Sequence, residues 1–172
     1  ERLANWVAAF LTGRRARVRC DGARSPFRDV GDHSVPQGTV LGPYAFLVYY
    51  DGLAEAAVQG LPDGARVELS LYADDVAALV TAPTASVATA AAQKVLDNIK
   101  AWCDENGMQI NAGKTTMTVI GRRRVPEEER PDLTYGGAPI EYKQAAKFLG
   151  VLIDETLNFD AHMTWKKSQY AA

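Results

Sequence analysis

Hydrophobic and polar positions alternate most regularly along residues 67–72, where every second side chain is aliphatic. A period of two residues is typical of a strand that buries one face. The chain then passes through two adjacent carboxylates, Asp74 and Asp75, and is apolar again as far as Val80. The pattern predicts two strands joined as a hairpin, with both carboxylates at its tip.

Elsewhere the apolar residues recur at intervals of three and four, which is typical of amphipathic helices. The first such segment ends near Thr12-Gly13, and the longest one begins at a cap formed by Thr84 or Ser86 and ends at Asn106-Gly107. The predicted helices cover residues 3–11, 43–57 (as a buried helix), about 85–105 and 161–172.

Shorter apolar runs between turn residues predict further strands. Two of them are expected to form a hairpin around Asp21-Gly22, and two more to flank Gly136-Gly137. Together with the helices they predict an α+β fold, a sheet with helices packed on one face. The predicted strands cover residues 16–20, 25–30, 116–120, 133–135, 140–142 and 148–153.

The composition allows one domain with a real core, because 47% of the 172 residues are hydrophobic and 23% are charged. The net charge of -2 is unusual for a free-standing nucleic-acid binder, which is expected to carry a basic face. Arginines do gather in residues 14–28 and again at residues 122–124. Such runs are most often solvated faces.

The two cysteines, Cys20 and Cys103, lack the spacing of a zinc site or a disulfide framework, so both are expected to be reduced, buried thiols. No apolar run approaches the roughly 18 to 20 residues needed to cross a bilayer, and the first residues of the sequence lack the basic, apolar and small-residue pattern of a signal peptide. We expect a soluble, intracellular protein that does not act on a membrane. Because the chain starts at Glu1 and stops within a predicted helix, we also expect a fragment of a longer protein.

The paired carboxylates at residues 74 and 75 carry the main chemical expectation. Two adjacent anions between apolar strands repel each other and resist burial, and a bound divalent cation stabilises such an arrangement. Magnesium is the natural candidate. For a bare pair of acids between strands, however, an ordinary polar turn is the better interpretation.

Four segments resemble reverse transcriptases and follow one another in the order that this family uses. Tyr72-Ala73-Asp74-Asp75 resembles the motif at the family's metal site. Residues 34–43, Ser-Val-Pro-Gln-Gly-Thr-Val-Leu-Gly-Pro, are similar to its Pro-Gln-Gly motif in the version typical of non-LTR (LINE-like) retrotransposons. Residues 107–115 resemble the segment that carries an Asn and a Lys-Thr pair, and residues 147–154 the segment near the primer grip.

This resemblance implies a polymerase palm-like antiparallel sheet with helices packed on one face, incomplete because most of the fingers and thumb are missing. Residues 1–172 would form a single palm-region fragment. Within it, residues 1–33 would be an entry helix and hairpin, residues 34–154 the palm motifs, and residues 155–172 the start of a following helical segment.

The resemblance also assigns roles to individual residues. Asp74 would bind metal directly and Asp75 would share the same site, while Lys114 would contact the nucleotide triphosphate or donate a proton to pyrophosphate. By themselves, Lys114 is an ordinary solvated lysine and His162 a structural residue. The implied contacts are Pro36, Gln37, Gly38 and Lys114 for template and nucleotide, and Tyr72, Ala73, Phe148, Leu149 and Gly150 for the primer, although residues 148–150 read equally well as core.

One expected carboxylate is missing. The family takes a third metal ligand from an earlier Phe-x-Asp strand, and residues 1–33 hold no such motif, since Phe27-Arg28-Asp29 lies too close to the Pro-Gln-Gly loop and is better explained as strand and turn. The hypothesis is that this chain alone has a damaged metal site and negligible polymerase activity, and that the whole protein or its ancestor has the activity.

The implied function is RNA-directed DNA polymerisation for retrotransposition. Two Mg²⁺ ions, for which Mn²⁺ is a possible substitute, would transfer dNTPs onto a DNA primer along an RNA template. The family resemblance places the protein in the nucleus or in a cytoplasmic ribonucleoprotein and leaves its oligomeric state open. The alternatives are a non-catalytic, polymerase-derived scaffold that binds RNA or protein and, more weakly, a two-metal nuclease, in which the Pro-Gln-Gly segment has no obvious role.

Overall fold

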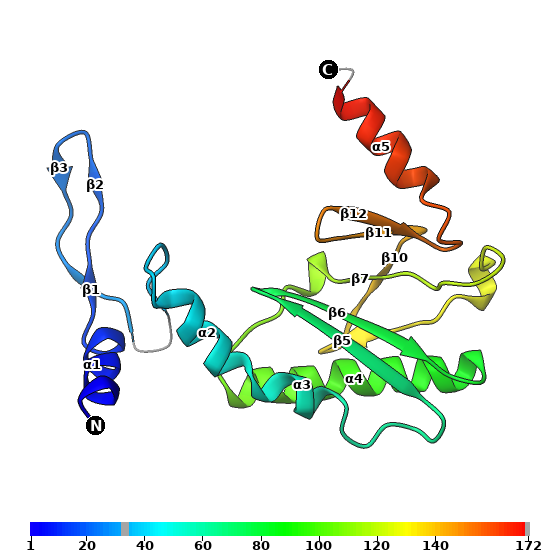
Figure 1. Cartoon of the computed structure of the whole chain (residues 1–172), viewed down its shortest axis with the longest axis horizontal. Helices are drawn as coiled ribbons and strands as arrows, with labels where there is room; N and C mark the ends of the chain where they lie inside the picture. Colours follow the sequence, from blue (N-terminus) through cyan, green and yellow to red (C-terminus); the bar gives the residue numbers. More distant parts are fainter. Residues whose placement is uncertain (32–34, 171–172) are drawn as a thin grey trace. The chain divides into compact units, whose positions relative to one another are not determined.

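A computed structural model describes residues 1–31 and 35–170, which form two compact units, Glu1–Asp51 and Gly52–Ala172 (Figure 1). Ser34, the first residue of the Pro-Gln-Gly segment, lies outside the described residues, as do Ala171 and Ala172 at the end of the last predicted helix. Each unit is described by itself. The three-part division of the chain stays a prediction.

The first unit begins with the predicted helix, α1, which spans Arg2–Leu11. The N–H and the hydroxyl of Thr12 both donate to the carbonyl of Ala8, and Gly13 follows with a φ of +62°. The helix therefore ends where the sequence predicts. The strands of this unit are β1 (Arg15–Ala16), β2 (Arg19–Cys20), β3 (Ala23–Arg24) and β4 (Arg28–Asp29), and its second helix is α2 (Gly42–Tyr50).

The predicted hairpin around Asp21-Gly22 is confirmed, because β2 pairs with β3 and β1 with β4, both antiparallel. The pairing register shifts by one residue between the two ladders. Arg15 faces Asp29 and Arg19 faces Arg24, so the first strand advances four residues where the second advances five. Pro26 lies in this interval, and a residue without an N–H is tolerated at such a bulge.

The prediction of one buried helix over residues 43–57 is wrong. The segment forms two helices, α2 and α3 (Gly52–Ala57), and much of α2 is exposed, including Leu47 and Val48. Gly52 follows the break, and glycine is a weak helix former. The side chains of α2 are themselves apolar on every face of the helix. Intervals of three and four residues therefore fit several faces and do not identify which one is buried.

The long helix α4, Ala85–Glu105, organises the second unit. The Thr84 hydroxyl oxygen caps it by accepting the Val87 N–H at 3.3 Å, and Gly107 follows its last turn with a φ of +66°. Both ends agree with the prediction. Every fourth residue of one stripe is buried, and these residues are Ala91, Val95, Ile99 and Cys103.

Helix α3 packs against α4 and places Leu53 and Ala57 in the core. Polar side chains of α4 fix its neighbours: the Asn98 amide donates to the carbonyl of Ala57 at 3.1 Å and to that of Gln59 at 2.8 Å. The Gln93 amide exchanges two 2.9 Å hydrogen bonds with the backbone of Thr134. The core is completed by Leu133, Tyr135 and Ile140.

The described strands form six separate pairs, five antiparallel and one parallel, and not the single sheet that the sequence suggests. The mixture of helices and small antiparallel sheets agrees with the α+β prediction. The second unit contains β5 (Arg66–Tyr72), β6 (Asp75–Thr81), β7 (Thr116–Met117), β8 (Thr134–Tyr135), β9 (Ala138–Pro139), β10 (Glu141–Tyr142), β11 (Ala145–Phe148) and β12 (Val151–Asp154), two short 3₁₀ turns (Ala112–Lys114 and Glu127–Glu129) and a last helix, α5 (Asp160–Tyr170).

The prediction of one strand over residues 148–153 is also wrong, because the segment folds back as the hairpin β11–β12. Its turn residues Leu149 and Gly150 have φ values of +45° and +83°, the combination found in type I′ turns. Gly150 adopts this conformation without strain, and an apolar residue at the turn conceals it from a pattern of hydrophobicity.

Three smaller expectations have clear outcomes. The ring of His162 in α5 accepts the N–H of Leu152 at 3.3 Å, so its predicted structural role is confirmed. Cys103 is buried as expected, but Cys20 is exposed, because the hairpin that carries it buries none of its side chains. In the part of the chain that the structure describes, no helix has the length and apolarity to span a membrane.

A candidate metal site at the tip of a hairpin

Strands β5 and β6 form the longest ladder in the described residues, with seven antiparallel pairs from Arg66↔Thr81 to Tyr72↔Asp75. Only Ala73 and Asp74 remain for the loop. Ala73 has a φ of +52° and Asp74 does not have a positive φ, which are the signs of a type II′ turn. The predicted hairpin with carboxylates at its tip is therefore confirmed, and an alanine holds the conformation that glycine prefers.

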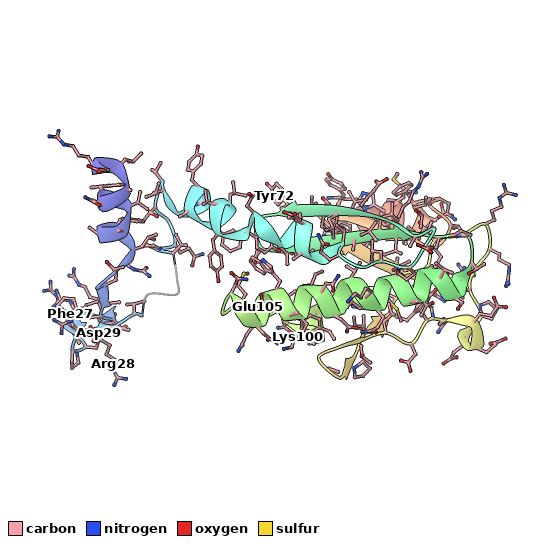
Figure 2. The ribbon with its side chains drawn as sticks, turned by 90° about the horizontal axis from the view of Figure 1, so that it is seen from below. Phe27, Arg28, Asp29, Tyr72, Lys100 and Glu105 are labelled. Carbon is pink, nitrogen blue, oxygen red and sulfur yellow. The ribbon has the colours of Figure 1, made fainter. Side chains whose placement is uncertain are left out.

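The two faces of this hairpin differ in the predicted way. Val67, Leu69 and Leu71 are half-buried, the residues between them are exposed, and β6 contacts α4 (Figure 1). Cross-strand partners share a face, so Asp75 lies on the exposed face with Tyr72, which is 63% exposed and is labelled near the end of the hairpin in Figure 2. One face of β5 is thus partly covered, while the carboxylates are exposed to solvent.

Both carboxylates are exposed, and carboxylate oxygens are the donors that Mg²⁺ and Mn²⁺ prefer. Adjacent oxygen donors at a fixed turn fit part of a metal site. No cluster of three or more His, Cys, Asp or Glu side chains suited to a metal exists among residues 1–31 and 35–170. Within these described residues, the donor set around Asp74 and Asp75 is therefore incomplete.

Asp29, the acidic residue of the Phe27-Arg28-Asp29 segment, has an ion-pair partner within its own unit. It belongs to β4, and its carboxylate lies 3.5 Å from Nε of Arg15 on the paired strand. The prediction that Phe27-Arg28-Asp29 is strand and turn agrees with this geometry.

The Pro36-Gln37-Gly38 loop belongs to the first unit and is closed by its own hydrogen bonds. The Thr39 hydroxyl donates to the Pro36 carbonyl at 2.8 Å and accepts the Gly42 N–H at 3.1 Å, which ties the loop to the start of α2. A Cβ on Gly42 would lie 2.9 Å from the Pro36 oxygen, so a side chain there would break the loop. Gln37 and Gly38 are exposed at its surface, Gly38 with a φ of +79°.

Lys114 closes the 3₁₀ turn Ala112–Lys114 and exposes its side chain. The turn is held by the Asn111 carbonyl, which accepts from the N–H groups of Lys114 and Thr115 and from the Thr115 hydroxyl. Strand β7 follows directly. No hydrogen bond or ion pair between described side chains joins Lys114 to Asp74 or Asp75.

The last predicted contact segment, Phe148-Leu149-Gly150, is the tip of the β11–β12 hairpin. Phe148 is half-buried, and Leu149 is 47% exposed in the left-handed region, which costs a residue with a Cβ roughly 1 kcal/mol or more. The segment is therefore a strained, exposed turn as well as the end of a packed strand.

Sequence reasoning missed two buried carboxylates after this hairpin. Asp154 accepts the N–H and hydroxyl of Thr156 (both 3.0 Å) and the N–H groups of Asn158 (3.2 Å) and Phe159 (2.7 Å). Burial opposes ionisation, but these hydrogen bonds outweigh it and lower the pKa of Asp154. An Asp followed two residues later by Thr is a local turn signal that could have revealed this role.

Glu155 is 3% exposed and accepts the hydroxyl of Tyr142. Burial, and then the Glu155 carboxylate, raise the pKa of Tyr142. Because the partners of Asp154 and Glu155 belong to the chain, we assign these carboxylates to the structure of the second unit and not to the metal site.

A family model and the similar proteins both point to reverse transcriptases. The model of the family described as "Reverse transcriptase (RNA-dependent DNA polymerase)" matches residues 2–153. The "RNA-directed DNA polymerase from mobile element jockey" of Drosophila funebris is 34% identical over 92% of this chain, and that of Drosophila melanogaster is 31% identical over 92%. The chain spans 17% of the length of each of these relatives. No solved structure matches it significantly.

Proposed function

Because the chain belongs to the reverse transcriptase (RNA-dependent DNA polymerase) family, in its non-LTR retrotransposon branch, we propose that it supplies the catalytic hairpin of an RNA-directed DNA polymerase. The observation that carries this proposal is the pair Asp74-Asp75, exposed at the tip of a seven-pair ladder. The continuous ladder, with the other face of β5 partly covered, would hold these acids in place without burying them.

Asp74 and Asp75 would hold Mg²⁺, or Mn²⁺ in its place, in the complete protein. The bound ions would supply electrostatic stabilisation of the negative charge that develops during phosphoryl transfer. This chain provides two exposed carboxylates at the ladder's end, and Ala73 fixes the turn that orients them. A third ligand from outside this chain would complete the donor set, so we expect the 172-residue chain alone to be inactive.

The remaining motif residues fit supporting roles in a polymerase palm. The rigid loop at Pro36-Gln37-Gly38 would face the template base and the incoming dNTP, since a glycine lets the backbone approach closely. Lys114 would contact the triphosphate as a charge-assisted donor. The tip at Phe148-Leu149-Gly150, with Tyr72 and Ala73, would lie along the DNA primer.

The reaction proposed for the whole protein is the addition of dNTPs to a DNA primer along an RNA template during retrotransposition, in the nucleus or a cytoplasmic ribonucleoprotein. The alternative is a polymerase-derived scaffold that binds RNA without catalysis. It is favoured by one observation, the lack of a third acidic ligand beside Asp74 and Asp75 in the described residues.

Primer extension on an RNA template with Mg²⁺ separates the two. The complete reading frame that contains this chain is compared with its Asp74→Asn/Asp75→Asn variant and with Asp63→Asn, an exposed carboxylate before β5. The polymerase proposal predicts extension that the double variant abolishes and the control retains. Absence of extension by a folded, complete reading frame would favour the scaffold.

A further inference from the structure

The first unit carries a second hairpin of opposite charge, residues 14–30, which we call the arginine hairpin. It holds six arginines and two aspartates, a net charge of +4 in a chain of net charge -2. The other residues therefore sum to -6. Every residue from 15 to 30 is exposed, so these guanidinium groups form a surface and not a part of the core.

Most of this charge has no counter-ion. Arg15 pairs with Asp29, whereas no ion pair among the described residues involves Arg17, Arg19 or Arg24. Arg19 and Arg24 are direct cross-strand partners. Like charges in that position destabilise a hairpin, so this arrangement opposes folding and favours an external anion.

Phe27 organises two of the guanidinium groups on one face. The guanidinium of Arg17 lies 4.6 Å and that of Arg15 5.5 Å from the centre of its ring, within the range of a cation–π interaction. Figure 2 shows Phe27 and Asp29 gathered on this hairpin. Two guanidinium groups thus lie beside this half-exposed ring, where they offer donors for phosphate.

We propose that the arginine hairpin binds the phosphate backbone of a single-stranded stretch of RNA, the template strand, independently of its sequence. The inference rests on the proposed function, which supplies that strand. Guanidinium groups match phosphate with two parallel hydrogen bonds. Arg15, Arg17 and Arg19 alternate along one arm of the hairpin, from β1 to β2. In extended backbone, alternate residues are about 6.6 to 6.8 Å apart, on the scale of successive phosphates in an extended nucleic-acid strand.

The test is the affinity of the 172-residue chain for a fluorescent 20-nucleotide RNA of mixed sequence, measured by anisotropy over a series of KCl concentrations. The variant is Arg17→Gln/Arg19→Gln/Arg24→Gln. The matched control, Arg122→Gln/Arg123→Gln/Arg124→Gln, removes the same charge from another exposed run. We expect the hairpin variant to bind at least tenfold more weakly with a salt slope lower by about 2, and the control to change by less than threefold.

A charge-preserving variant and a second ligand serve as controls for this experiment. Arg17→Lys/Arg19→Lys/Arg24→Lys keeps the charges, so it should keep the salt slope and most of the affinity, which separates charge from misfolding. A 20-base-pair RNA–DNA hybrid should be affected less than threefold by the glutamine variant. Equal losses in the hairpin variant and the control would overturn the proposal, and so would a larger loss on the hybrid than on the single strand.

The outcomes are distinguishable from those for the proposed function. Lost extension in the Asp74→Asn/Asp75→Asn variant with unchanged RNA binding in the hairpin variant would reject this inference alone. Weakened RNA binding without any extension by the complete reading frame would reject the polymerase and retain the inference.

Discussion

The two hairpins of this chain differ in both charge and support. The acidic hairpin β5–β6 has an unbroken ladder of seven pairs, and β6 lies against α4. The arginine hairpin has two ladders of two pairs each, separated by a bulge, and none of its side chains is buried. One presents two carboxylates on a packed scaffold, and the other presents six arginines on an unsupported ribbon.

The difference agrees with what each charge is proposed to do. Carboxylates that hold metal ions need fixed positions, and a packed face with a continuous ladder provides them. A surface that follows a phosphate backbone gains from adjustable side chains, since it recognises charge and not a particular geometry. A continuous ladder is therefore found where chemistry is proposed, and an interrupted, exposed ladder where binding is proposed.

The largest predicted effect separates the two roles completely. Arg17→Glu/Arg19→Glu/Arg24→Glu should weaken RNA binding by at least a hundredfold, because attraction becomes repulsion. Asp74→Asn/Asp75→Asn should leave RNA binding within threefold of the parent while lowering extension by the complete reading frame on the order of 10³-fold or more. Binding is read by anisotropy and extension on denaturing gels.

The contrast between the two hairpins would be wrong if either set of variants changed both RNA binding and primer extension. Loss of RNA binding in the aspartate variant would show that the acidic hairpin is needed for the fold or for the RNA. Circular dichroism of each variant reports whether it is folded.

The second prediction tests the support of the acidic hairpin. Leu53 is 1% exposed between α3 and α4, so Leu53→Ala should lower the free energy of unfolding by about 2 to 5 kcal/mol. Leu3 in α1 is 74% exposed, and Leu3→Ala should change it by less than about 0.5 kcal/mol. Urea unfolding followed by circular dichroism measures both, and similar losses would show that the first unit has a core of its own.

The sequence predicts the supported region better than the unsupported one. Alternation identifies β5 and β6, and a cap, a buried stripe and a terminal glycine identify α4, because in each case local preference and burial agree. It fails for α2, which is apolar all round, and at Leu149, where an apolar residue occupies a turn. Neither the bulge near Pro26 nor the pair of hydrogen bonds between Gln93 and the backbone of Thr134 leaves a periodic pattern in the sequence.

For the candidate site, the motifs identify Asp74, Asp75 and the loop at Gln37, and the structure adds the turn that exposes the two acids. The assigned roles remain proposals. Asp154 has partners only two to five residues further along the chain, which the Asp-x-Thr pattern could have indicated. Glu155 escapes prediction because its partner, Tyr142, becomes adjacent only after folding. Side-chain pairs across a fold depend on packing, which a single sequence does not reveal.

The third prediction concerns the core between α4 and β8 at alkaline pH. Burial, and then the neighbouring Cys103, raise the pKa of Tyr135 to about 12 from its ordinary value of 10.0. The folded state then holds a proton that the unfolded state releases, so stability is full below pH 10 and falls as the pH rises towards 12. Urea unfolding between pH 8 and 12 should show this decline.

Cys103 contributes to the same decline, because burial also raises the pKa of its thiol. Tyr135→Phe should therefore make the free energy of unfolding fall less steeply with rising pH, and Cys103→Ala should do so independently. The arginine hairpin has no buried group, so neither substitution should change its stability. An unchanged slope in Tyr135→Phe would show that this hydroxyl ionises as freely in the folded chain as in the unfolded one.

The smallest predicted effect is the most specific to the arginine hairpin, because stability and binding should change in opposite directions. Arg24→Glu converts the like-charge pair with Arg19 into an opposite-charge pair and should stabilise the β2–β3 ladder by about 0.2 to 1 kcal/mol. Arg28→Glu makes the same change of charge opposite Ala16 and should not stabilise the hairpin.

Amide hydrogen exchange at the hairpin measures the stability of the ladder, and RNA anisotropy measures the affinity for RNA. If Arg24→Glu slows exchange and weakens RNA binding while Arg28→Glu leaves exchange unchanged, the Arg19–Arg24 pair is a charge arrangement that costs stability and serves binding. If Arg24→Glu leaves exchange unchanged, the pair carries no repulsion for RNA to relieve, and the contrast between the two hairpins reduces to their packing.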